Sequence, residues 1–469
     1  MIQHCPVLIV LLPLTAALLC LLFSKFNKNL GSWLVIGSIA GSLACSLQVL
    51  HQTLTSGEAI HYWMGNWEPP LGIEFVIDPL SAVMAVLITF ISLMVAVYSK
   101  PFMRKEDWLH IGGYYTLYGL LTVGLCGMVI TGDMFNLYVY LEVMSLSGYG
   151  LIAMGGKKSM LAAFRYMLIG TIGASLYLIS VAYLYAMTGT LNMADLGERI
   201  MPYLSSPPFA LAVACLFIGF GIKMALFPLH GWQPDAYNFA HPGSAAFIAG
   251  VMSKVPAYAI IRFFFYIFGV NNPIVSTALT VLGILGIGGV LIGSIMALAQ
   301  YDFRRMLAYS SVAQIGYIAI GLAIGNMYGF IGAVLHIINH AFMKSALFLV
   351  IGGIQYRFGE INLYRLGGLN KKMTLSTITV TLAALSMVGI PPTAGFFSKW
   401  YLMLGAYQGG QYFYIVVLVI SSLLNAVYFF RILEQMFVQH EASLTEINRH
   451  EGKRSEEHTS ELQSPGIIS

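Results

Sequence analysis

Four ionisable residues lie inside long apolar segments of this 469-residue chain: Glu142, Lys223, Lys254 and Lys399. Charged residues make up only 9% of the sequence, and hydrophobic residues make up 58%. A charge at the centre of a bilayer costs at least about 2.5–3.5 kcal/mol, so such residues normally face a protein interior or a water-filled path. Ion or proton conduction is therefore the function they first suggest. The alternative is structural: the lysines reach the membrane surface or form salt bridges.

The residue types suit proton transfer. Burial disfavours the charged form of lysine, whereas arginine effectively never releases its proton. Lys254 lies close to Pro256, which should loosen the local backbone hydrogen bonds and admit water. An ionised Glu142 would hold Lys223 charged, and separating the pair would release a proton. Asp133 starts the same helix as Glu142, and it is either a helix cap or a proton-path residue.

A row of basic side chains is predicted on a later helix. His336, His340 and Lys344 are spaced four residues apart and therefore share one helical stripe. Because histidine titrates nearest physiological pH, the row could relay protons or bridge water; the alternative is that it packs neutrally between helices. His230 and His241 are too loosely placed to complete a metal site. The five cysteines show no CxxC spacing, so they indicate no disulfide, zinc site or iron–sulfur cluster. We expect no metal, cofactor or catalytic residue in this chain.

The elements that position these residues are predicted to be membrane-spanning helices. A soluble domain would carry roughly 25% charged residues, and long apolar runs in lipid satisfy their backbone as helices. Apolar runs of about 20 residues, the length that crosses a bilayer, recur along the chain. The thirteen predicted spans are approximately 5–23, 31–50, 77–98, 109–130, 133–153, 160–188, 207–228, 243–267, 272–298, 303–325, 327–355, 373–407 and 411–436. The fold class is thus an all-α polytopic membrane protein.

Loop charges predict the orientation. The basic residues of alternate loops are Lys25, Lys28, Lys100, Arg104, Lys105, Lys157, Lys158, Arg304, Arg305, Arg357, Arg365, Lys371, Lys372 and Arg431. The intervening loops carry Glu58, Glu68, Asp195 and Glu198, with Arg199 as the one clear basic residue. Basic loops are normally cytoplasmic. We therefore expect a cell-membrane (inner-membrane) protein with its N-terminus outside.

Two of the predicted helices should be interrupted beside a lysine. Pro228 follows Lys223 by five residues, and Pro391 and Pro392 precede Lys399. Proline removes a backbone donor and clashes with the preceding turn, so the seventh span should break near Phe227 and the twelfth near the proline pair. Broken helices in corresponding places point to paired internal repeats around a central ion path.

The end of the chain is polar and is excluded from the fold. Residues 454–464 read RSEEHTSELQS, which matches the translation of a common sequencing adapter. We therefore expect 454–469 to be an artefact within a polar tail that covers 438–469. A disordered tail is the alternative explanation.

Six segments, taken in order, resemble one family of membrane proteins. They are GDMFNLYVYLE, GIKMALFPLHGWQPDAY, HPGSAAFIAGVMSKVPAYAIIR, DFRRMLAYSSVAQIGY, HIINHAFMKSALF and GIPPTAGFFSKW. About residues 70–435 thereby resemble the antiporter-like membrane subunits shared by Mrp-type Na⁺/H⁺ antiporters, respiratory complex I and membrane-bound hydrogenases. A lysine in the eighth helix and another in the twelfth best suit the D-type subunit of Mrp antiporters.

The resemblance implies a fold and an activity. The fold is two inverted five-helix repeats with helices 7 and 12 broken: residues 1–100 hold helices 1–3, 101–270 the first repeat and 271–437 the second. Members usually have fourteen helices, so the last is expected to be missing here. Glu142, Lys223, Lys254 and Lys399 match the family's ionisable axis, joined by His336, His340 and Lys344.

The implied function is monovalent cation/proton antiport, with protons, Na⁺ or another monovalent cation, and other membrane subunits as partners, without nucleic acid. The alternative is a proton-pumping subunit of an NADH-quinone oxidoreductase or a membrane-bound hydrogenase. Any redox chemistry would then belong to partner subunits, because no flavin, nucleotide or iron–sulfur motif is present. An inert scaffold or a receptor is a further alternative, but neither requires buried titratable groups.

Overall fold

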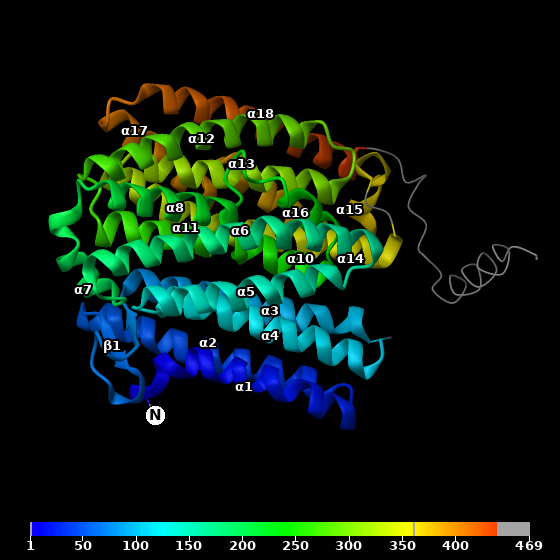
Figure 1. Cartoon of the computed structure of the whole chain (residues 1–469). Coiled ribbons are helices and arrows are strands. Elements are labelled where there is room, and N and C mark those ends of the chain that lie inside the picture. Colours follow the sequence, from blue (N-terminus) through cyan, green and yellow to red (C-terminus); the bar gives the residue numbers. More distant parts are fainter. Residues whose placement is uncertain (1, 105, 360–361, 439–469) are drawn as a thin grey trace, which may run out of the picture.

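The computed structural model describes residues 2–104, 106–359 and 362–438. The parts of the predicted tail from 439 to 469, including the adapter-like segment, lie outside the described residues. The long helices run side by side, so that the two ends of the bundle correspond to the two sides of a membrane (Figure 1). The N-terminus, β1 and α7 lie at one end, and α15 lies at the other.

The predicted spans coincide with the observed helices. The first part of the chain contains α1 (Cys5–Phe26), α2 (Leu30–Ser56), α3 (Pro79–Met103), α4 (Trp108–Ile130), α5 (Met134–Ala153), α6 (Lys157–Thr188), α8 (Pro207–Met224), α9 (Gln233–Phe239), α10 (Pro242–Phe247) and α11 (Lys254–Ile261). The second part contains α12 (Pro273–Leu298), α13 (Phe303–Ala323), α14 (Met327–Phe358), α16 (Thr374–Val388), α17 (Ala394–Gln408) and α18 (Tyr412–Phe437). Short connections form α7 (Met193–Arg199) and α15 (Leu369–Lys372).

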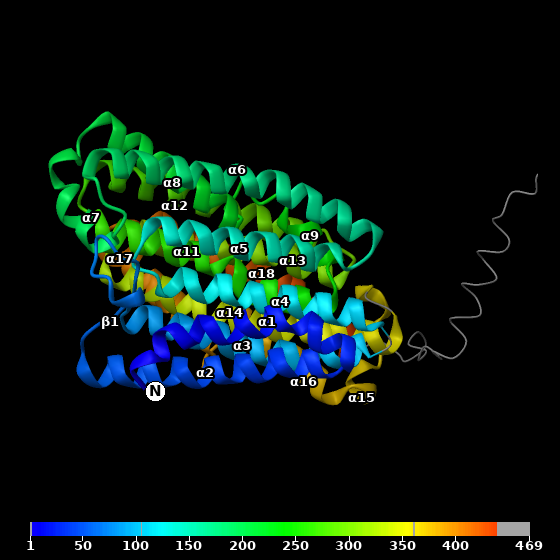
Figure 2. The same ribbon diagram turned by 60° about the horizontal axis from the view of Figure 1, so that its bottom comes forward.

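Eleven helices of the described chain are long and apolar enough to span a membrane, when Pro242–Ile267 is taken as one span. The other two predicted spans are α5, which carries Glu142, and the broken pair α16 and α17. An 18-residue stretch of the span Pro242–Ile267 is completely buried, and a stretch of the same length in Phe303–Ala323 is nearly so. Figure 2 shows α1 and α2 at one edge of the bundle and α6 with α8 at the opposite edge. Fully buried polar residues of these two spans, including Lys254, Ser310 and Gln314, are therefore shielded from lipid.

Both predicted helix breaks are present. The seventh span ends as α8 at Met224, three residues before the predicted position, and resumes as α9 at Gln233. Ala225 takes a left-handed conformation with φ of 60° at this end. The twelfth span ends as α16 at Val388, followed by Gly389 with φ of 88°, and α17 begins at Ala394. Each break leaves backbone carbonyl groups without helical partners.

Two features were not predicted. The eighth span is interrupted by π-helical turns at Ile248–Met252 and Arg262–Ile267, which lie on either side of α11. The loop after α2 forms an antiparallel hairpin of β1 (Ile60–Trp63) and β2 (Glu74–Ile77), in which Ile60 pairs with Ile77. The four-residue strands are too short to show a clear alternating pattern in the sequence.

Candidate functional site

Lys223 is held by side chains of α5. It lies in the last turn of α8, is 1% exposed, and its Nζ donates hydrogen bonds to Ser145 Oγ (2.6 Å) and Tyr149 Oη (3.3 Å). Glu142 occupies the same face of α5, three and seven residues before these partners. Glu142 and Lys223 interact electrostatically but form no ion pair within 4 Å in the described chain. Ser145 and Tyr149 are therefore the direct partners of the ammonium group.

Aromatic packing fixes the break beside Lys223. Trp232 Nε1 donates to the carbonyl oxygen of Ile222 (2.9 Å), one of the groups freed by the end of α8. The Trp232 ring stacks on Tyr166 of α6, with centroids 3.7 Å apart and planes 10° from parallel. A Cβ on Gly170 of α6 would lie 2.1 Å from Tyr149 Oη and 3.4 Å from Lys223 Nζ. Glycine at this position therefore leaves the space that Tyr149 occupies.

Lys254 is the first residue of α11 and follows the π-helical turn Ile248–Met252. Its side chain is completely buried, and Nζ donates a hydrogen bond to the carbonyl oxygen of Ala249, within that turn. The π-helical geometry thus supplies the acceptor for a charge placed at this depth. Lys254 interacts electrostatically with His336, His340 and Lys344 on α14. It belongs to the span that connects to the second part of the chain.

The predicted row on α14 is buried and faces α13 and α17. His336 Nε2 lies 2.9 Å from Gln314 Oε1, and His336 Nδ1 lies 3.1 Å from Ser398 Oγ. The rings of His336 and His340 are stacked, with centroids 6.1 Å apart. Neither ring nitrogen of His340 has a hydrogen-bond partner among the residues that the structure describes.

Lys344 is the last residue of the row and lies near the middle of α14. Its Nζ donates to the carbonyl oxygen of Leu307 (2.8 Å) and to Ser310 Oγ, both on α13. Lys344 forms no ion pair in the described chain, and these hydrogen-bond partners of its amino group are uncharged.

Lys399 binds the backbone at the end of α16, where the twelfth span is broken. Its Nζ donates to the carbonyl oxygens of Met387 and Val388 (both 2.9 Å) and to Ser422 Oγ on α18 (3.0 Å). Those carbonyls are the last of α16, where the helix dipole is negative and a cation is favoured. The ammonium also lies 4.8 Å from the centroid of the Tyr317 ring, on which His336 stacks. Lys399 is 4% exposed, so it does not extend to the surface.

The ionisable residues thus form two groups. Glu142 and Lys223 make up the first. The second runs from Lys254 through the α14 row to Lys399, which interacts electrostatically with His336. No hydrogen bond or ion pair joins the two groups within the described ranges, and the second group has no carboxylate partner there.

Asp133 is the N-cap of α5. Its carboxylate accepts a hydrogen bond from the backbone N–H of Asn136 (2.6 Å), which is the geometry of the predicted helix cap. His241 likewise caps α10 through its Nδ1, which accepts from Gly243 N (3.3 Å). Burial, with a contribution from Arg304, lowers the pKa of His241 to about 3, which fits a neutral acceptor. No group of three metal-ligating side chains occurs among residues 2–104, 106–359 and 362–438.

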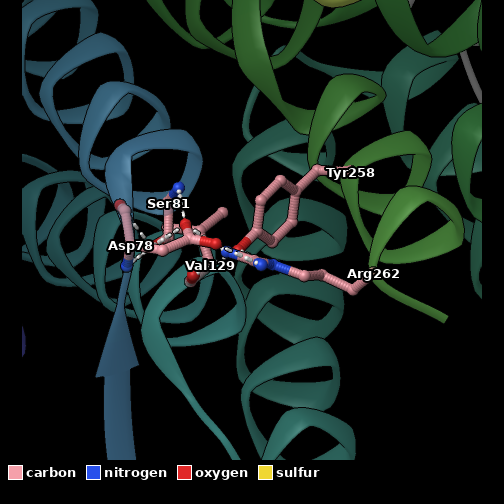
Figure 3. A network of polar contacts seen from close by, with 5 residues as sticks. All are labelled: Asp78, Ser81, Val129, Tyr258 and Arg262. Carbon is pink, nitrogen blue, oxygen red and sulfur yellow. Dashed lines mark hydrogen bonds and ion pairs between the residues drawn. The ribbon is translucent and has the colours of Figure 1, made fainter. Parts of the chain in front are cut away.

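A third polar cluster lies near the β1 end of the bundle (Figure 3). Arg262, eight residues after Lys254, donates to both carboxylate oxygens of Asp78, at 2.6 and 2.5 Å. Tyr258 lies between Lys254 and Arg262 on the same helical stripe; it accepts from Arg262 Nε (2.6 Å) and donates to the carbonyl oxygen of Val129 (2.7 Å). Asp78 also caps α3 through Ser81. The cluster ties the eighth span to α3 and α4.

Breaking the Asp78–Arg262 pair should destabilise the protein. Removing one partner of a fully buried pair leaves an uncompensated charge and typically costs about 3–5 kcal/mol. The side chains of Asp78 and Arg262 are 18% and 16% exposed, so this cost is an upper bound for them. We expect Asp78→Leu and Arg262→Met each to lower the apparent melting temperature of the detergent-purified protein more than the double variant does. Arg199→Gln is the control, since it removes an exposed pair with Asp195, worth about 0–1 kcal/mol. Equal losses in the single and double variants would contradict the argument.

Several contacts were absent from the predictions. Ser145 and Tyr149 could have been found from their spacing to Glu142, and Arg262 from its charge in an apolar span. Nothing in the sequence distinguishes Gln314 and Ser422 as contact residues, because single polar residues are common in membrane helices.

Comparison with known proteins places this arrangement in one family. Residues 131–425 match the family model described as "NADH:quinone oxidoreductase/Mrp antiporter, TM", and residues 63–110 match "NADH-Ubiquinone oxidoreductase (complex I), chain 5 N-terminus". NADH-quinone oxidoreductase subunit N of Desulforudis audaxviator is 47% identical over 439 residues, 94% of this chain and 87% of the relative. The D-type subunit of the Na(+)/H(+) antiporter of Alkalihalophilus pseudofirmus is 32% identical over 423 residues, 89% of this chain and 84% of the relative.

Solved structures give the same result. A chain of the archaeal membrane-bound sulfane sulfur reductase, a respiratory membrane complex, superposes with a TM-score of 0.89 and 28% identity, covering 97% of this chain and 93% of that one. A chain of the Mrp complex from Dietzia sp. DQ12-45-1b gives a TM-score of 0.84 and 29% identity, covering 94% and 80%. Together with the helical architecture and the family match over most of its length, these likenesses show that the chain belongs to the NADH:quinone oxidoreductase/Mrp antiporter transmembrane family.

Proposed function

We propose that this chain is the ion-translocating membrane subunit of a multisubunit monovalent cation/proton antiporter. The observation that carries the proposal is the second group: buried bases from Lys254 to Lys399 with no carboxylate partner in the described chain. A purely structural lysine would be paired, because an isolated buried charge is costly. Groups that gain and lose a proton avoid that cost while neutral.

The bases act on one another through charge. Like charges in a poorly screened interior disfavour one another, so protonating one base discourages protonation of the next. When Lys254 becomes protonated, its charge is therefore expected to repel protons on His340 and His336 and so to move a proton toward Lys399. Glu142 and Lys223 form the site that loads this row. Because both nitrogens of buried His340 lack protein partners in the described chain, water is the natural bridge there.

The proposal includes a membrane orientation and a division into repeats. We place the basic loops in the cytoplasm, so that the N-terminus and the β1–β2 hairpin face outside. We assign the first repeat to 101–270 and the second to 271–437. Each has five spanning segments, with a 32-residue third helix (α6 or α14) followed by a broken one. Since five is odd, the two repeats are inverted relative to each other.

A second candidate has specific support. The 47% identical relative is named for an NADH-quinone oxidoreductase, so the same row of bases could be driven by electron transfer in partner subunits. Both candidates place this chain among other membrane subunits and assign it the same proton path. They differ in the source of energy.

Vesicles containing the assembled complex distinguish them. We expect an imposed pH gradient to drive Na⁺ or K⁺ exchange without any electron donor, measured with ion-sensitive dyes inside the vesicles. Lys254→Met, which keeps the bulk but cannot carry a proton, should abolish the exchange in complexes that assemble on native gels. Proton movement only when a reductant and a quinone are supplied would reject the antiporter in favour of the second candidate. Full activity of assembled Lys254→Met would reject the common path.

A further inference from the structure

A basic cavity lies at the cytoplasmic-loop end of the N-terminal helices. It has a volume of about 570 Å³ and is formed where α2 and α4 begin and α3 ends, beside the end of α14. Lys28, Lys100 and Arg104 line it together with polar Ser32 and Tyr115. The cavity is distant in sequence from the ionisable axis and shares no residue with it.

The three cations have no anionic partner in the described chain. None of them takes part in an ion pair there. Lys28 Nζ donates only to the carbonyl oxygen of Arg104 (3.4 Å), and Lys100 Nζ lies 3.5 Å from the centroid of the Trp33 ring. Asp107, which is close in sequence, does not line the cavity; its Oδ1 caps α4 by accepting from His110 N (2.8 Å). Three like charges around one space favour an anion between them.

The start of α2 adds to this attraction. Asn29 precedes the 27-residue helix without a side-chain cap, and it also lines the cavity. The first N–H groups of a helix and the positive end of its dipole attract phosphate. The dipole of α2 thus adds to the positive charge of the three side chains.

The position of the cavity bears on the class of anion that would fit it. Trp33 is 56% exposed and Trp108 is 40% exposed, and such tryptophans mark the level of the lipid headgroups. Because α1 and α2 form an edge of the bundle (Figures 1 and 2), membrane lipid has direct access from that side. Basic pockets between helices on the cytoplasmic side suit lipid phosphates.

We propose that this cavity, lined by Lys28, Lys100 and Arg104, binds the phosphate headgroup of an anionic phospholipid. The acyl chains lie along the exposed apolar surface of α1 and α2. The same chemistry would accept inorganic phosphate, and the test separates the two.

The test compares lipid retention by the purified complex in native mass spectrometry after incubation with phosphatidylglycerol or phosphatidylcholine. The wild type should retain phosphatidylglycerol preferentially. Lys28→Gln/Lys100→Gln should weaken that retention about 30-fold, the factor that corresponds to about 1 kcal/mol for each interfacial lysine. Lys28→Arg/Lys100→Arg, which keeps both charges, should retain the lipid. Lys157→Gln/Lys158→Gln removes the same charge at the start of α6, on the opposite edge of the bundle, and should leave retention unchanged.

Three outcomes would overturn the proposal. One is equal retention of the two lipids by the wild type. Another is the same loss in both glutamine double variants, which would indicate diffuse attraction to the membrane surface. The third is displacement of phosphatidylglycerol by millimolar inorganic phosphate, which would make the cavity a phosphate site. Native gels before each measurement establish that the variants are assembled.

Discussion

Lys223→Ala is expected to reduce ion-coupled transport to background while the complex still assembles. The substitution removes the base to which we assign proton transfer, and with it the hydrogen bonds to Ser145 and Tyr149 of α5. Ser145 keeps a hydrogen bond to the carbonyl oxygen of Leu141 in its own helix (2.6 Å), so folding should survive. Glu142→Gln should have the same effect, because it removes the charge that interacts with Lys223. Transport is measured as pH-gradient-driven exchange in vesicles.

Lys223→Arg provides the sharper control. Arginine keeps the positive charge but effectively never releases a proton, so it should be as inactive as alanine if Lys223 carries protons. If the charge alone is needed, arginine should restore transport. Lys157 is exposed, so Lys157→Ala is the matched surface control and should leave transport unchanged. Wild-type transport by an assembled Lys223→Ala or Glu142→Gln complex would remove that residue from the pathway.

Lys399→Ala is expected to block net transport as completely as the loss of Lys223. If the halves are inverted repeats, Lys399 beside the second break performs the exit-side role and exchanges its proton with the outer side. Lys399→Met should also be inactive, because Lys399 is buried and bonded to α16 and α18. A lysine that merely reached the surface would tolerate methionine. The three variants are compared by the same vesicle exchange, with assembly checked on native gels.

Lys399→Glu should keep part of the activity. The end of α16 presents carbonyl oxygens, which repel an ionised carboxylate but accept a hydrogen bond from a protonated one. Glutamate can therefore carry a proton at this position, although less well than lysine. A fully active Lys399→Met would show that Lys399 carries no proton. An inactive Lys399→Glu would show that the helix end requires a cation.

The membrane helices were predictable because few backbone structures are stable in lipid. Each span must be about 20 apolar residues long and satisfy its own backbone, and all thirteen predicted spans correspond to helices. The breaks were predictable because proline cannot donate a hydrogen bond. The β1–β2 hairpin and the π-helical turns around α11 were not predictable, since hydrophobic periodicity does not register four-residue strands or one extra residue in a turn.

The sequence by itself determined which residues bear titratable groups at membrane depth, because an isolated charge in an apolar span is conspicuous and costly. It also determined that His336, His340 and Lys344 share a face, since helical spacing is local. Only the tertiary structure decided their hydrogen-bond partners. Lys223 donates to Ser145 rather than to Glu142. Lys254 donates to a carbonyl oxygen of the π-helical turn, and Lys399 donates to a carbonyl oxygen at the end of α16. These contacts join residues of different helices or depend on a local irregularity. They are set by how the helices pack, which one-dimensional patterns do not encode.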